Sequence, residues 1–247
     1  MSENKTAVIL WAGCGRRIAG RYGGMHKALI SLNGEPLLAH LLRNAAKAGV
    51  TELVPVVGYR GDTLLAAIES YGGMFQSIIP VYNPDYETTN NLGSLLCGEK
   101  LLRDRDFIVV NGDMVFDANI LSDIFNVDGN AVAADLHDYG RQLDSPRLLI
   151  GEGRIFDIGR HRTIEESQGY AVGIYKFSKD FSAEYFRLGR KLFEARPDAG
   201  YHDVLIGCLD RVLFRASPVK KNSWMDVDEP DDVPKAEAML QRLAREA

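Results

Sequence analysis

Residues that could bind phosphate are concentrated near the start of the chain. They are two glycines, two arginines and a lysine: Gly13, Gly15, Arg16, Arg17 and Lys27. They follow an apolar run, residues 6–11, that is typical of a buried parallel strand. Glycine backbone can approach a ligand closely, and successive N–H groups can form a nest for phosphate oxygens. The nearby cationic side chains add the charge that a triphosphate requires, although a tight turn with solvated arginines would give the same pattern.

Two other glycine-rich phosphate loops fit this segment poorly. A dinucleotide-binding turn needs glycine or alanine where Ile18 stands, and an acid after the second strand, where Asn33 and Gly34 stand instead. A P-loop needs a Gly-Lys-Ser/Thr ending, which is absent from the segment. A dehydrogenase is therefore a distant alternative.

Acidic residues occupy two later positions that could face the same ligand. Asp113 follows an apolar run, residues 107–110, and ligands of open α/β sheets gather at the carboxyl ends of strands. A second acidic group lies in the stretch 224–232, where Asp226 and Asp228 would share a face if the segment is extended. Asp231 and Asp232 follow Pro230 and are better explained by the start of a helix.

The elements that must position these residues alternate between strand and helix in the first half of the chain. Strands are predicted at 6–11, 28–32, 53–57, 78–82, 107–110, 131–135, 147–151, 154–158, 170–177 and 211–216. Helices are predicted to start at Pro36 and to span 62–71, 92–102, 181–195, 203–209 and 230–247. This order predicts an α/β fold with a Rossmann-like, mixed but mostly parallel sheet flanked by helices, and a small antiparallel lid after about residue 128.

Residues 6–34 resemble the opening of the sugar-phosphate and cytidylyl nucleotidyltransferase superfamily, which includes the MobA-like NTP transferases. Its signature is a strand, Ala-Gly-x-Gly-x-Arg, a variable loop and Pro-Lys-x-Leu. Here the signature is matched by Ala12, Gly13, Gly15, Arg17 and Lys27-Ala28-Leu29. One departure is His26, which stands where the family usually has proline.

The resemblance implies a role for each matched residue. Gly13 and Gly15 would contact the NTP, Arg17 would bind its β- and γ-phosphates, and Lys27 would bridge the α-phosphate and the incoming phosphate. Arg16 would join the nucleotide contacts. Residues 1–128 would form the NTP-binding half of a single domain, and residues 129–247 the acceptor-binding half plus the C-terminal helix.

The resemblance also implies a metal site and a base pocket. Asp113 and Asp226, with Asp228 as a further candidate, would hold Mg²⁺, which prefers oxygen ligands and keeps several waters. Asn91 and Ser94 lie in a stretch similar to the base-binding segment of phosphocholine-type cytidylyltransferases, although Asn91 would serve equally well as a helix N-cap. The remaining predicted nucleotide contacts are Leu10, Ala12, Gly58 and Gly112.

Predicted acceptor-binding residues come from the second half of the chain. Tyr170 and Gly173 lie in a stretch similar to the family strand that lines the acceptor pocket. Tyr201 and Asp203 would suit an ammonium-bearing acceptor, because an aromatic face and a carboxylate both attract a cation. The competing interpretation is that Tyr201 packs in the core and Asp203 caps a helix.

Composition argues against several classes of protein. A net charge of −5 provides no basic excess for nucleic acid or an anionic membrane surface. The three cysteines are far apart and lack CxxC spacing, which argues against a disulfide framework or a structural zinc site. The early apolar run is too short for a signal peptide or a membrane span, so a cytoplasmic protein is expected. A homodimer is compatible with these features.

Three functions remain open at this point. The leading hypothesis is an enzyme that transfers a nucleoside monophosphate from an NTP, with CTP favoured, to a small phosphorylated acceptor such as phosphocholine, an aminoalkylphosphonate or a polyol phosphate. The second is a nucleotidyltransferase that acts on a sugar 1-phosphate with UTP, dTTP or GTP. The third is a non-catalytic nucleotide-binding regulator on the same scaffold, which the persistence of Lys27, Asp113 and Asp226 disfavours.

Overall fold

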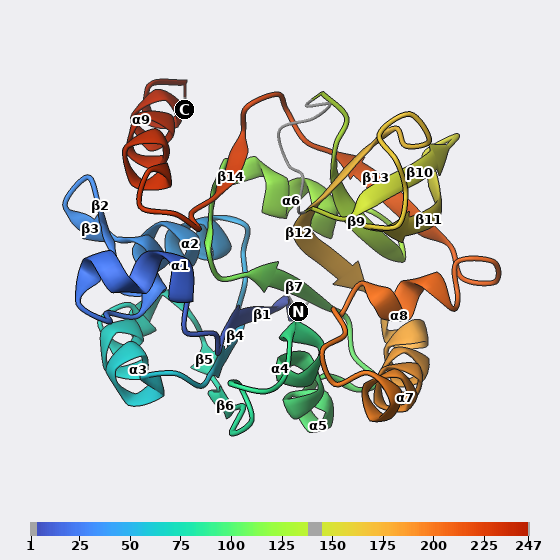
Figure 1. Cartoon of the computed structure of the whole chain (residues 1–247), viewed down its shortest axis with the longest axis horizontal. Coiled ribbons are helices and arrows are strands. Elements are labelled where there is room, and N and C mark those ends of the chain that lie inside the picture. Colours follow the sequence, from blue (N-terminus) through green and yellow to red (C-terminus); the bar gives the residue numbers. More distant parts are fainter. Residues whose placement is uncertain (1–3, 138–144, 247) are drawn as a thin grey trace.

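A mixed β-sheet forms the centre of the protein, whose computed structural model describes residues 4–137 and 145–246 (Figure 1). The strand order is β10-β11-β13-β9-β12-β7-β1-β4-β5, with β6 also beside β4. The strands of this sheet are β1 (Thr6–Trp11), β4 (Glu52–Val57), β5 (Ser77–Ile78), β6 (Val81–Tyr82), β7 (Phe107–Asn111), β9 (Asn130–Asp135), β10 (Arg147–Gly151), β11 (Arg154–Gly159), β12 (Gly169–Phe177) and β13 (Phe214–Pro218). The predicted fold class is confirmed.

The first strand lies at the middle of the parallel part of the sheet. β1 pairs with β4 on one side and β7 on the other, both in parallel. Because parallel strands end at one edge, the residues that follow these three strands come together there. The Tyr59 N–H donates to the Ala12 carbonyl at 3.0 Å, which ties the end of β4 to the start of the glycine loop.

The antiparallel strands of the second half extend this same sheet. β12 runs antiparallel to both β7 and β9, and β10 pairs antiparallel with β11. β13 runs parallel to β9, so the second half is itself mixed. The predicted antiparallel region is therefore continuous with the nucleotide-side strands through the β7–β12 pair.

Helices cover both faces of the sheet because its central strands are apolar on both sides. Ala7 and Ile9 of β1 pack toward one face, and Val8 packs toward the other. The first face is covered by α2 (Leu37–Lys47), α3 (Gly61–Glu69) and α6 (Asn119–Phe125). The second is covered by α4 (Asn91–Cys97), α5 (Glu99–Leu102), α7 (Lys179–Ala195) and α8 (Asp203–Ile206). None of the helices in the described part of the chain is long and apolar enough to cross a membrane.

A third, smaller core joins the two ends of the chain. Ile18 of α1 (Arg16–Ala19), Val227 and Ala236 of α9 (Asp232–Glu246) are all fully buried in it. Beside this core, β14 (Trp224–Asp226) pairs antiparallel with β8 (Met114–Phe116), and β2 (Ser31–Leu32) pairs with β3 (Glu35–Pro36). Figure 1 shows α9 and β14 next to the N-terminal elements. The late acidic stretch is thus packed against the glycine loop.

Several predicted element boundaries are wrong, each for a local reason. The strand predicted at 28–32 is instead the 3₁₀ helix η2 (Lys27–Leu29), whose Ala28 N–H is capped by the His26 side chain, followed by β2. The strand predicted at 78–82 is divided at Pro80, which has no N–H to donate. The helix predicted at 92–102 is divided at Gly98 into α4 and α5. The strand predicted at 211–216 begins later, at Phe214.

Gly112 allows the closest approach between β1 and the end of β7. A Cβ atom at this position would lie 2.1 Å from the Trp11 ring and 2.5 Å from the Leu10 carbonyl oxygen. The Trp11 indole N–H also donates to the Gly112 carbonyl at 2.7 Å. The ring cannot move away from a methyl group without losing that hydrogen bond.

We therefore expect Gly112→Ala to lower the free energy of unfolding by at least about 2 kcal/mol, measured by urea denaturation. Gly73→Ala is the matched control, because no atom lies within 4 Å of the Cβ that it adds. Its expected change is within about 0.5 kcal/mol. Equal effects of the two substitutions would contradict the packing role of Gly112.

Candidate active site

The glycine loop curves around a cavity at the carboxyl end of β1. Gly15 has a positive φ of 55°, and a Cβ there would lie 3.2 Å from the Cβ of Lys27, so glycine suits this position on both counts. Gly13 has no atom within 4 Å of its missing Cβ, which leaves its backbone open to a ligand. The cavity has a volume of about 310 Å³. Its lining includes Leu10, Gly13, Gly15, Arg16, Arg17, Lys27, Gly112, Asp113 and Asp228.

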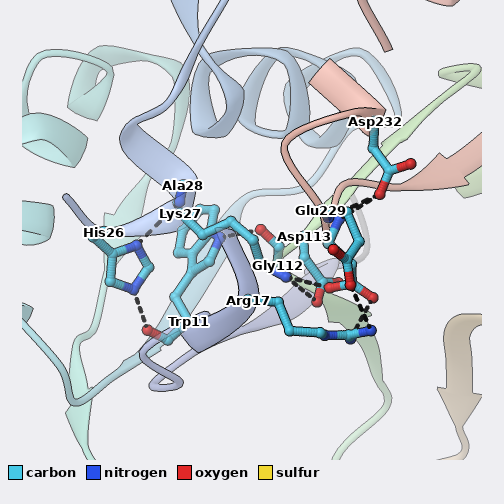
Figure 2. A network of polar contacts seen from close by, with 10 residues as sticks. Trp11, Arg17, His26, Lys27, Ala28, Gly112, Asp113, Glu229 and Asp232 are labelled. Atoms are coloured by element: carbon cyan, nitrogen blue, oxygen red, sulfur yellow. Dashed lines mark hydrogen bonds and ion pairs between the residues drawn. The ribbon is translucent and has the colours of Figure 1, made fainter. Parts of the chain in front are cut away.

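Lys27 connects the N-terminal loop to both acidic segments. Its Nζ lies 2.9 Å from Asp113 Oδ2 and 2.6 Å from Asp228 Oδ1 (Figure 2). Burial alone would lower the pKa of Lys27, whose side chain is only 12% exposed, but the two carboxylates outweigh burial and raise the pKa well above its ordinary value. The ammonium is therefore charged throughout the neutral range, as a phosphate-binding group must be.

His26 fixes the backbone that carries Lys27. Its Nδ1 accepts the Ala28 N–H at 3.1 Å, so Nε2 carries the proton and donates to the Trp11 carbonyl at 2.9 Å. Burial lowers the pKa of His26 and keeps the ring neutral. The φ of His26 is −63°, the angle at which a proline ring is locked. Histidine thus keeps the conformation that proline would impose, and adds two hydrogen bonds.

The late acidic segment is held by its own backbone contacts. The Val227 N–H donates to the Asp113 carbonyl at 2.7 Å. Asp232 Oδ2 accepts the N–H groups of Asp228 and Glu229, at 3.1 and 2.9 Å. Arg17, whose side chain is 56% exposed, reaches Asp228 Oδ2 at 2.9 Å and so bridges the loop to this segment (Figure 2).

Three carboxylates meet in this small space, and two of their oxygens suit a cation. Asp113 Oδ1 and Asp226 Oδ1 are buried and have no hydrogen-bond partner. Burial, with the charges of Asp113 and Asp228, raises the pKa of Asp226 well above its ordinary value. A divalent cation bound between Asp113 and Asp226 would satisfy both oxygens and keep Asp226 ionised. Since the described residues form no cluster of three or more metal-ligating side chains, further ligands would have to be phosphate oxygens or water.

A second, smaller cavity of about 240 Å³ opens beside the glycine loop and would accommodate a base. Of the predicted nucleotide-binding residues, its lining contains Leu10, Ala12, Gly13, Asn91, Ser94 and Gly112. Asn90, not Asn91, is the N-cap of α4, because Asn90 Oδ1 accepts the Asn91 N–H at 2.7 Å. The helix-capping role expected as an alternative for Asn91 is therefore wrong, and Asn91 lines this cavity.

A third cavity of about 610 Å³ lies on the other side of Asp113 and Asp226, where an acceptor could bind. Gly173 and Tyr201 are among its lining residues, together with Asn111, Arg160 and Tyr175. Tyr201 is also only 2% exposed and packs in the core of the second face, as the competing interpretation expected. A Cβ at Gly173 would lie 2.6 Å from Asn111 Nδ2, and the Tyr201 hydroxyl donates to Asn111 Oδ1 at 3.1 Å. Asp113, Asp226 and Asp228 also line this cavity, so the acidic cluster separates it from the glycine loop.

Three of the predicted contact residues lie outside these cavity linings. Gly58 lies behind the base cavity, where a Cβ would be 2.8 Å from the Tyr86 ring and from the Ala12 carbonyl oxygen. Tyr170 is 2% exposed, and the wall nearby is formed by the residues that follow it in β12. Asp203 accepts from Arg196 and from the Gly200 N–H at 2.6 and 2.9 Å, so it braces the turn before α8.

Two residues that line the acceptor cavity, Asn111 and Arg160, were not predicted from the sequence. The position of Asn111 could have been predicted from the sequence, because it ends β7 two residues before Asp113. The position of Arg160 could not have been predicted, because this residue follows β11 at the far side of the sheet and reaches the site only through tertiary packing.

The role of His26 can be tested by stability. We expect His26→Ala to lower the free energy of unfolding by about 1–3 kcal/mol, because it removes two buried hydrogen bonds and leaves the Trp11 carbonyl unpaired. His26→Pro should be closer to wild type, because its fixed φ matches the native angle and restricts the unfolded chain. Chemical denaturation of both variants measures the difference. A proline variant less stable than the alanine variant would contradict this account.

Comparisons with known proteins agree with this geometry. Residues 7–184 match the family described as the MobA-like NTP transferase domain. The chain is 30% identical to a CMP-5'-(3-aminopropyl)phosphonate synthase of Streptomyces rubellomurinus, over 94% of this chain and 40% of that protein. It is 27% identical to a bifunctional IPC transferase and DIPP synthase of Aquifex aeolicus, over 97% of this chain and 53% of that protein. The chain thus spans about half or less of the length of these relatives.

A solved structure supports the fold independently. The inositol-1-phosphate CTP transferase from T. maritima superposes with a TM-score of 0.82, at 22% identity, over 97% of this chain and 96% of that chain. The family match includes the glycine loop, Lys27 and Asp113, which are the residues that the structure brings together. The chain therefore belongs to the MobA-like NTP transferase domain family.

Proposed function

We propose that this chain is a Mg²⁺-dependent cytidylyltransferase. It would transfer CMP from CTP to an oxygen of a small phosphorylated or phosphonylated acceptor and release pyrophosphate. The observation that carries the proposal is the position of Lys27, which contacts both acidic segments. One of its partners, Asp113, lines the glycine-loop, base and acceptor cavities alike.

The chemistry requires alignment and charge neutralisation more than proton transfer. An acceptor phosphate is already largely ionised at neutral pH, since its second pKa is about 6. One of its oxygens would attack the α-phosphorus in line, and the bond between that phosphorus and the β-phosphate oxygen would break. Lys27 would neutralise charge on the α-phosphate and Arg17 on the departing pyrophosphate.

Asp113 and Asp226 would hold the metal ion. Their two buried, unpartnered oxygens support this assignment. Mg²⁺ bound there would supply positive charge that neutralises and orients the phosphate oxygens. Asp228, which contacts both Lys27 and Arg17, would position the two cations that face the nucleotide.

The preference for CTP and the class of acceptor draw on relatives as well as on geometry. The name of the first relative contains an aminoalkylphosphonate, and the name of the solved structure contains inositol 1-phosphate and CTP. The acceptor cavity is polar enough for either, with Arg160, Asn111 and Tyr201 in its lining. Asp203 pairs with Arg196 instead, so it gives no support to an ammonium-bearing acceptor.

The proposal is tested by incubating the protein with Mg²⁺, each of CTP, UTP, dTTP and GTP, and a set of phosphorylated and phosphonylated acceptors, scored for pyrophosphate. We expect release with CTP and at least one acceptor. Lys27→Ala should lower the turnover by at least a hundredfold, because no other described cation lies between the two carboxylates.

Lys47→Ala is the control for this experiment, since Lys47 lies at the end of α2 and outside the three cavities. Release with UTP and a sugar 1-phosphate would support the alternative substrate class. Nucleotide binding without release from any pair would indicate a regulator. Near-normal turnover of Lys27→Ala would refute its catalytic role.

The metal assignment predicts a specific change in Mg²⁺ dependence. Asp226→Asn keeps the size of the side chain but removes its charge, so we expect at least a tenfold higher Mg²⁺ concentration for half-maximal CTP binding. Calorimetric titration of CTP at several Mg²⁺ concentrations measures this without turnover. Asp231→Asn, at an exposed position on the same segment, is the control. An unchanged Mg²⁺ requirement in Asp226→Asn would remove Asp226 from the site.

A further inference from the structure

Two residues of α4 line the base cavity, and their other hydrogen bonds determine whether each presents a donor or an acceptor. Asn91 and Ser94 lie three residues apart on this helix, and therefore on one face of it. Both line the cavity of about 240 Å³ beside the glycine loop. The groups that they present can be deduced from their other partners.

The amide of Asn91 is oriented by a backbone group. The Tyr201 N–H donates to Asn91 at 2.9 Å, and an N–H can only donate, so the atom that faces it is Oδ1. The amide nitrogen of Asn91 must then point the other way. No described residue accepts a hydrogen bond from this nitrogen, which leaves it as a donor at the boundary of the base cavity and the acceptor cavity, both of which Asn91 lines.

The hydroxyl of Ser94 is oriented by Asn83, which lies behind it and is 3% exposed. The Asp85 N–H donates to Asn83 Oδ1 at 3.0 Å, so the Asn83 amide nitrogen faces Ser94 and Thr89. That nitrogen donates to Ser94 Oγ at 3.0 Å and to Thr89 Oγ1 at 3.2 Å. The Thr89 hydroxyl donates to the Asp85 carbonyl at 2.9 Å.

The hydroxyl group of Ser94 is consequently free to donate a hydrogen bond to a ligand. Its oxygen already accepts from Asn83, so the O–H cannot point there, and within the described ranges no group accepts it. Ser94 is 6% exposed and lines the base cavity. The cavity therefore presents two neighbouring donors, the Ser94 O–H and the Asn91 amide N–H.

We infer that Asn83 selects cytosine over uracil by holding Ser94 as a hydrogen-bond donor. Cytosine carries two neighbouring acceptors, O2 and the unprotonated N3, which match two neighbouring donors. In uracil, N3 carries a proton, which would meet the Ser94 O–H donor to donor. This inference rests on the proposed function, and it assigns Asn83 as a positioning residue that does not itself touch the nucleotide.

The test is Asn83→Asp, with binding measured by calorimetry for CTP and for UTP, each with Mg²⁺ and without acceptor. In this variant the Asp85 N–H still binds one oxygen, and the other oxygen faces Ser94. Ser94 must then donate to the carboxylate and present a lone pair to the cavity. We expect CTP to bind at least about tenfold more weakly, and the ratio of CTP to UTP affinity to fall at least about tenfold.

Thr88→Asp is the matched control, since it adds the same charge at an exposed position on the same loop. It should leave the CTP to UTP ratio within about twofold. Turnover of Asn83→Asp at saturating CTP should stay within a few-fold of wild type, because the defect lies in binding. An unchanged affinity ratio in Asn83→Asp would overturn the inference.

A second variant tests the same donor if Asn83→Asp does not fold. Ser94→Ala removes the donor itself, so it should also lower the affinity ratio by at least about tenfold, and an unchanged ratio would overturn the inference. A wild-type protein that binds UTP as tightly as CTP would overturn it as well. If the wild type discriminates as expected but releases no pyrophosphate, the proposed function fails and the assignment of the base contacts stands.

Discussion

The ammonium group of Lys27, held between Asp113 and Asp228, is the interaction on which the site depends. It joins three segments that are far apart in the sequence, and it is mostly shielded from water. A charge in such a place is favourable only when its partners are close, and removing one partner leaves the other unpaired. The two contacts therefore fix the relative position of the N-terminal loop, the end of β7 and the late acidic segment.

The apolar packing around this charge cluster explains how the segments reach it. The small core of Ile18, Val227 and Ala236 holds α9 and the segment after β14 against the glycine loop. The β8–β14 pair and the Val227 to Asp113 hydrogen bond add directional constraints. Burial of the apolar residues provides the stability, and the polar contacts determine which charged groups meet.

The sequence was sufficient for the fold class and for the main charged residues. Uninterrupted apolar runs predicted β1, β4 and β7, and the residues that follow them meet at one edge of the sheet, as parallel pairing requires. The β8–β14 pair was missed because both strands have only three residues and pair across about a hundred positions. The contacts of Asp203 with Arg196 and the Gly200 N–H were not predicted, because they depend on a turn that has no sequence pattern of its own.

A crystal structure with bound CTP and Mg²⁺ would show whether the triphosphate and the metal ion meet at Lys27. We expect the triphosphate in the glycine-loop cavity, Lys27 Nζ within hydrogen-bonding distance of the α-phosphate, and the metal ion bound by Asp113 and Asp226. The cytosine ring would lie against Ser94 and Asn91. A triphosphate bound away from Lys27, or a metal ion that contacts neither Asp113 nor Asp226, would contradict this arrangement.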